Sequence, residues 1–107
     1  MKPEDELCLC FHVTKLKVTN WVRVTKPRRV GQLSECYGAG TGCGWCRPFL
    51  ERIFWQAAAA GEITPDRKPG EGVEDRELTA EEYAQQRANY VRAGKGTPPP
   101  GATAIGQ

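Results

Sequence analysis

Four cysteines in two short pairs are the residues of this sequence best suited to chemistry. Cys8-Leu9-Cys10 is a C-x-C pair, Cys43-Gly44-Trp45-Cys46 is a C-x-x-C pair, and 32 residues separate the two. Thiolates are soft ligands, so the two pairs together can supply four ligands to a zinc ion or to an iron-sulfur cluster. The C-x-C pair is less typical of structural zinc, whose pairs usually enclose more residues. The spacing alone is compatible with both a zinc ion and an iron-sulfur cluster.

Disulfides are the weaker interpretation of the same cysteines. No apolar run of the kind found in a signal peptide precedes Cys8, so we expect a cytoplasmic protein, whose thiols stay reduced. The fifth cysteine, Cys36, is expected to be a small buried apolar residue and no ligand. His12 lies two residues after Cys10 and is expected to sit beside the site without ligating a metal.

Composition divides the 107 residues into two unequal parts. Residues 1–60 contain nine Lys/Arg against five Asp/Glu and hold every Cys, Trp and Phe, whereas residues 61–107 hold twelve of the twenty Gly and Pro. The first part is therefore the expected folded unit. A unit of this size usually needs a bound metal, a disulfide or a partner for stability. No apolar run approaches the roughly 18 residues of a membrane span, so no membrane association is expected.

Three short helices are expected to position the cysteines. Thr14 is a suitable N-cap for a helix that ends before Pro27, and a short second helix is expected over residues 30–37, with Gly38 after it. A third helix is expected from Pro48 to the stop at Gly61. Its predicted apolar face consists of Phe49, Leu50, Ile53, Phe54 and Ala57. Cys46 would then lie at a helix N-terminus, which favours negative charge.

The two cysteine segments together resemble a known family. The residues that carry the resemblance are Cys8-Leu9-Cys10-Phe11-His12-Val13-Thr14 and Gly38-Ala39-Gly40-Thr41-Gly42-Cys43-Gly44-Trp45-Cys46-Arg47-Pro48. They are similar to those of the bacterioferritin-associated ferredoxin-like (BFD-like) [2Fe-2S] domains, over about residues 7–56. The resemblance implies an all-α fold of helix-turn-helix character. It also implies that Cys8, Cys10, Cys43 and Cys46 bind one [2Fe-2S] cluster. Independently, the alternating glycines of the second segment are suited to aiming backbone N–H groups at cluster sulfurs.

The expected function is that of a small electron-transfer protein and not of an enzyme. No catalytic triad or phosphate loop is present, and four cysteine ligands leave the cluster no open position for a substrate. The resemblance implies a protein redox partner, either a bacterioferritin whose iron store is reduced or a reductase, and hence a role in iron homeostasis. The alternatives are a structural zinc-binding interaction module and a protein that delivers metal or clusters. The modest positive charge makes nucleic acid an improbable partner.

Residues 61–107 are expected to add little to this site. We assign residues 7–60 to the [2Fe-2S] domain, residues 61–78 to a linker rich in Pro, Gly and charges, and residues 79–93 to an extra helix. Thr79 and Glu82 form a capping box at the start of that helix. Residues 94–107 contain Pro98-Pro99-Pro100 and are expected to be disordered.

Overall fold

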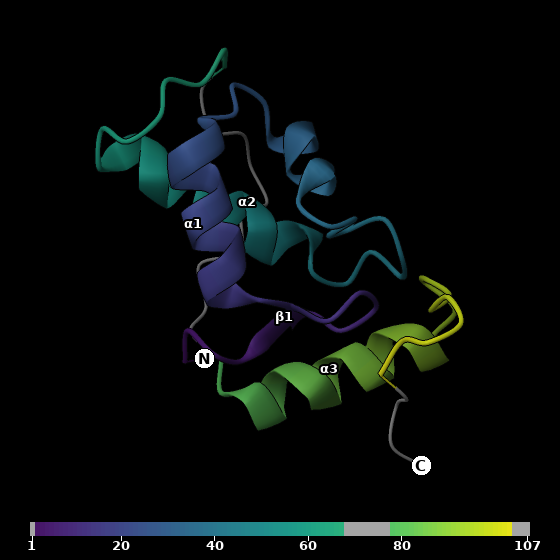
Figure 1. Ribbon diagram of the computed structural model, residues 1–107. Coiled ribbons are helices and arrows are strands. Elements are labelled where there is room, and N and C mark those ends of the chain that lie inside the picture. The colour runs from purple at the N-terminus through teal and green to yellow at the C-terminus, as the bar shows by residue number, and fades with distance from the viewer. Residues whose placement is uncertain (1, 68–77, 104–107) are drawn as a thin grey trace.

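The computed structural model describes residues 2–67 and 78–103. The elements follow the order β1 (Glu6–Cys8), β2 (Val13–Thr14), α1 (Lys15–Thr25), η1 (Val30–Glu35), α2 (Arg47–Ala59) and α3 (Ala80–Arg92). Figure 1 shows α1 crossing in front of α2, with α3 lying along the opposite side of β1. No helix in this part of the chain is long and apolar enough to span a membrane.

The all-α prediction is confirmed only in part, because a small sheet accompanies the helices. Strands β1 and β2 pair antiparallel, with Glu6 opposite Thr14 and Cys8 opposite Val13, and a bulge lies between the two pairs. The intervening turn places His12 at a φ of 57°. The hairpin buries Leu7, Cys8 and Val13, which gives the C-x-C segment a fixed backbone.

Helix α1 begins and ends where the sequence predicts. The Thr14 side chain accepts a hydrogen bond from the Lys17 backbone N–H, as an N-cap does. At the other end, Lys26 adopts a left-handed conformation immediately before Pro27, whose ring disfavours a further helical residue. The helix turns Val18 and Val22 into the core, and α1 packs against α2.

The second predicted helix forms as a short 3-10 helix. It ends at Glu35, and Cys36 is its C-cap, so Tyr37 and Gly38 both lie beyond the helix. Both of these residues have positive φ values, 54° and 80°. The chain leaves the helix through this left-handed turn and enters the glycine-rich segment that carries Cys43. Leu33 is the buried anchor of this element.

Helix α2 supplies the largest part of the core. All five residues of its predicted apolar face are buried, namely Phe49, Leu50, Ile53, Phe54 and Ala57. Cys46 is the N-cap of the helix and Pro48 lies in the first turn, as expected from the sequence. The core therefore extends directly from this helix to the cysteine segment that precedes it.

Truncation of the central aromatic residue is expected to destabilise the fold. Phe54 is fully buried, so Phe54→Ala removes apolar contacts and leaves a cavity. We expect the free energy of unfolding to fall by about 3–5 kcal/mol, measured by denaturant titration. Val24→Ala is the matched control, because Val24 is 83% exposed on α1. Equal effects of the two substitutions would show that this core is wrongly assigned.

The part after residue 60 contains the extra helix that the sequence predicts. Helix α3 begins after Thr79 with the expected capping box between Thr79 and Glu82. The predicted linker, residues 61–78, falls largely outside the described residues, although Glu62 and Asp66 pair with Arg23 and Arg29. Residues 94–107 were predicted to be disordered, and the structure describes residues 94–103 with hydrogen bonds to the first cysteine segment, from Thr103 to Leu9 and between Gly101 and His12. Residues 104–107 lie outside the described residues.

Candidate metal centre

The fold brings both cysteine pairs to a single small cavity. Cys8 and Cys10 reach it from the β1–β2 hairpin, and Cys43 and Cys46 reach it from the loop that leads into α2. All four are buried, with exposed fractions between 1% and 6%. The cavity has a volume of about 10 Å³, which is the space of roughly one water molecule.

Backbone N–H groups surround the sulfur atoms. Interactions with the backbone N–H groups of Gly40, Phe11 and Cys10 help to lower the pKa of the Cys8 thiol. The Cys43 N–H donates to the Cys10 sulfur over 3.3 Å. Donors in this arrangement stabilise thiolate charge, and the glycine loop was predicted to provide them.

Two glycines of the loop are required by its geometry. A Cβ on Gly42 would lie 2.6 Å from the Cβ and 2.7 Å from the sulfur of Cys10, so only glycine permits this approach of the two arms. Gly44 has a φ of 85°, a conformation that other residues rarely adopt. Close packing of one cysteine arm against the other therefore requires glycine at position 42, and the backbone conformation favours glycine at position 44.

The thiols contact one another in two pairs that each join the two arms. The Cys46 thiol donates to the Cys8 sulfur, which lowers the pKa of Cys8 to about 5, against the opposing effect of burial, and raises the pKa of Cys46. Cys10 lies against Cys43, and burial raises the pKa of Cys10. Within residues 2–67 and 78–103, no three Cys, His, Asp or Glu side chains are grouped closely enough to hold a metal ion.

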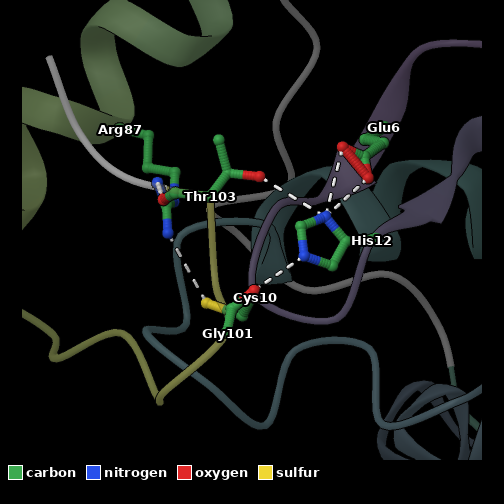
Figure 2. A network of polar contacts seen from close by, with 6 residues as sticks. All are labelled: Glu6, Cys10, His12, Arg87, Gly101 and Thr103. Carbon is green, nitrogen blue, oxygen red and sulfur yellow. Dashed lines mark hydrogen bonds and ion pairs between the residues drawn. The ribbon is translucent and has the colours of Figure 1, made fainter.

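Cys36 and His12 occupy the positions that the sequence indicated. Cys36 is fully buried, its pKa is raised by burial, and it does not line the cavity of the other four cysteines. His12 is exposed, and its two ring nitrogens lie 2.9 Å from a Glu6 carboxylate oxygen and 2.8 Å from the Gly101 carbonyl (Figure 2). These contacts raise the pKa of His12, that with Gly101 most strongly.

Two buried hydrogen-bond donors at the cavity indicate whether the site suits an anionic cluster. Arg87 and Trp45 both line the cavity, and the Arg87 Nε and Trp45 Nε1 atoms are buried without a hydrogen-bond partner. Buried donors normally find acceptors, and the sulfurs of a bound cluster are acceptors that this site would gain. The donor set and the two orphan donors therefore fit an iron-sulfur cluster held by thiolates.

Arg87 was not predicted to be a site residue, because the sequence marks the start of this helix by its capping box and offers no motif on it. Of the apolar residues of α3, Ala80 and Ala84 are exposed, whereas Tyr83 and Ala88 are buried. Tyr83, Arg87 and Tyr90 are spaced four and three residues apart and share one helical face, the face that meets the cysteine segments. This spacing in the sequence could have indicated that the three residues act together.

The part of the chain that contains both cysteine segments matches a known family model. Residues 7–56 match the model of the BFD-like [2Fe-2S] binding domain. This match confirms the resemblance drawn from the two cysteine motifs. No solved structure matches the chain.

Two curated fungal proteins are also similar to part of the chain. The nitrite reductase (NAD(P)H) of Neurospora crassa is 36% identical over 59 residues, which cover 54% of this chain and 5% of that protein. The nitrite reductase (NAD(P)H) of Emericella nidulans is 37% identical over 49 residues, which cover 46% of this chain and 4% of that protein. The chain thus spans about a twentieth of the length of these relatives.

Proposed function

Because residues 7–56 belong to the family of BFD-like [2Fe-2S] binding domains, we propose that this iron-sulfur protein is a one-electron carrier with a single [2Fe-2S] cluster. The observation that carries the proposal is the convergence of Cys8, Cys10, Cys43 and Cys46 on one buried cavity. When bound, such a cluster supplies reversible one-electron transfer and takes four cysteine thiolates as its ligands. We propose that the four cysteines are those ligands.

The residues of the site are suited to holding the negative charge of four thiolates. Cys46 lies at the N-terminus of α2, where the helix dipole favours negative charge. The Cys43 backbone N–H donates to the Cys10 sulfur, and interactions with backbone N–H groups help to lower the pKa of the Cys8 thiol. These donors suit a site that holds negative charge, and we propose that the protein is a carrier and not an enzyme.

We propose a reductase as the redox partner. The names of the two relatives describe enzymes that reduce nitrite with NAD(P)H, and such a reaction requires electrons to pass between sites. A bacterioferritin remains the second candidate partner, because the family resemblance implies it, and with it a role in iron homeostasis. All five cysteines are free thiols, which supports a reducing compartment such as the cytoplasm.

Anaerobic purification tests the proposal. We expect about two iron atoms and two sulfides per chain, visible absorption that bleaches on reduction, and uptake of about one electron per chain. Stoichiometric zinc without labile sulfide, in cells grown with ample iron, would replace the proposal with a structural zinc module. Complete transfer of the cluster to an apo-ferredoxin, faster than electron transfer to any reductase, would favour a delivery protein.

The partner is tested with the loaded protein. Stopped-flow mixing of the oxidised protein with an NAD(P)H-reduced flavin reductase is compared with mixing of the reduced protein with a ferric bacterioferritin core. We expect the reductase to reduce the protein faster than the protein reduces the ferric core. The reverse order of rates would make bacterioferritin the preferred partner.

A further inference from the structure

Residues 79–103 lie over the two cysteine arms, and we call them the C-terminal cap. The cap contacts the first arm through the Tyr83 hydroxyl, which donates to the Leu7 carbonyl, and through the Thr103 N–H, which donates to the Leu9 carbonyl over 2.8 Å. Figure 1 shows α3 running beside β1 and the chain after it turning back toward the same hairpin. The cap therefore closes over the backbone on both sides of Cys8.

The cap also contacts the second arm. The Tyr90 hydroxyl donates to the Cys43 carbonyl over 2.8 Å. Trp45, between the two cysteines of this arm, packs with its ring centroid 5.6 Å from each of Tyr83 and Tyr90. Gly96 approaches so closely that a Cβ on it would lie 1.9 Å from the Cys43 carbonyl oxygen. Both arms are thus held by an element that lies outside the family match at residues 7–56.

The centre of the cap is a buried arginine. Arg87 is 2% exposed, and among the described residues it is the one buried side chain that is polar or charged. One guanidinium nitrogen donates to the Thr103 carbonyl over 2.8 Å, and another lies 3.7 Å from the Cys10 sulfur (Figure 2). The third nitrogen, Nε, has no partner. A buried charge is costly unless opposite charge compensates it, so this position requires an anionic neighbour.

Among the described residues, the ionisable groups that act on the Arg87 guanidinium are the thiols of Cys10 and Cys43. Burial by itself lowers the pKa of Arg87, but hydrogen bonding and charge interaction with Cys10 and Cys43 outweigh burial and raise it. These are one cysteine from each arm. The guanidinium is therefore positioned where the negative charge of bound thiolates would concentrate.

We propose that Arg87 is a positioning residue that supplies the positive charge facing the iron-sulfur cluster, and that the C-terminal cap holds it there and shields the cluster from water. The inference rests on the proposed function, since it requires that a cluster binds. It adds a residue and an element outside the family-matched segment, and it assigns them control of the reduction potential and of cluster retention.

Loss of the Arg87 charge and opening of the cap are expected to change the reduction potential in opposite directions. The sign of the change therefore distinguishes the role of the charge from the role of the cap as a shield. Reduction adds one negative charge, so a nearby positive charge stabilises the reduced state and raises the potential. A substitution that removes the Arg87 charge while the cap stays closed therefore lowers the reduction potential. Opening of the cap admits water, which also stabilises the more highly charged reduced state and raises the potential.

The test uses the full chain loaded with cluster, after iron and sulfide have been measured in the wild type. We compare Arg87→Met and Arg87→Lys with Lys95→Met, a matched control that removes an exposed positive charge from the same cap. We expect Arg87→Met to shift the reduction equilibrium about tenfold toward the oxidised state, which is ~59 mV for one electron. Arg87→Lys should shift it less, because it keeps the charge but loses the fork geometry. Lys95→Met should match the wild type.

Shielding is tested by a second pair of variants. Gly96→Ala keeps Arg87 but displaces the cap from the Cys43 carbonyl, and Gly31→Ala is its control because nothing lies within 4 Å of the added carbon. We expect a chelator to remove iron several-fold faster from Gly96→Ala than from Gly31→Ala. The reduction potential of Gly96→Ala should not fall.

The outcomes distinguish the inference from the function on which it rests. Wild-type protein without iron and sulfide contradicts the proposed function, and the inference falls with it. A loaded Arg87→Met variant with the potential of Lys95→Met overturns the role of Arg87. If Arg87→Met does not assemble a cluster, the neutral but polar Arg87→Gln variant takes its place, and a potential of Arg87→Gln equal to that of Lys95→Met overturns the same role. Equal iron loss from Gly96→Ala and Gly31→Ala overturns the shielding role.

Discussion

Serine at Cys8, Cys10, Cys43 or Cys46 is expected to abolish stable cluster binding, whereas Cys36→Ser leaves it intact. Each of the first four thiols lines the shared cavity, and each interacts with a thiol of the other arm. Loss of one therefore removes a ligand and the link between the arms. Cys36 is equally buried but lies away from the cavity.

The measurement is iron and sulfide content with visible absorption for the five single variants, purified anaerobically in parallel. We expect each of the four ligand variants to retain less than about a tenth of the wild-type colour, and Cys36→Ser to retain essentially all of it. Burial makes Cys36→Ser mildly destabilising through the added hydroxyl, which a thermal melt will detect. Loss of colour on changing Cys36, with retention on changing one of the other four, would require a different ligand set.

Gly42→Ala is expected to prevent normal assembly of the site although it adds a single methyl group. The new Cβ would lie 2.7 Å from the Cys10 sulfur and 3.1 Å from the Pro99 side chain, so both the first arm and the cap must shift. Gly42 does not have a positive φ, and the effect is therefore steric. Overpacking of this kind costs about 1–3 kcal/mol even where the surroundings yield.

Iron content and the rate of iron loss to a chelator measure this effect. We expect Gly42→Ala to hold much less iron than the wild type and to release what it holds more quickly. Gly31→Ala is the control, since its added carbon meets nothing within 4 Å. Full iron content and wild-type retention in Gly42→Ala would show that the arms of the loaded protein do not approach as closely as they do in this structure.

Local patterns in the sequence predicted most of the helical framework. The apolar face of α2, the Thr14 cap, the break before Pro27 and the capping box at Thr79 all involve residues within a few positions of one another. Short-range sterics and backbone hydrogen bonding determine such features, so they are present in the sequence without knowledge of the fold. The short hairpin escaped prediction because its two strands contain only three and two residues and show no clear alternation.

The cysteine spacing predicted the donor set, but not its internal arrangement. Two chelating pairs and an alternating glycine loop identify four thiols by type and distance along the chain. Which thiols face each other depends on how the hairpin docks on the loop. The structure joins Cys8 with Cys46 and Cys10 with Cys43, across the two arms. Close packing of Gly42 against the Cys10 side chain accompanies that arrangement, and no local pattern encodes it.

The sequence by itself therefore determined the chemistry of this protein, through the identity and spacing of its cysteines and the helices beside them. Only the tertiary structure decided what surrounds that chemistry. Arg87 lies 77 positions from Cys10, and Thr103 lies far along the chain from the Leu9 backbone that it binds. Such contacts depend on the docking of α3 and the residues after it. The cap docks because its aromatic residues bury apolar surface against Trp45. This docking places the Arg87 guanidinium near the Cys10 sulfur.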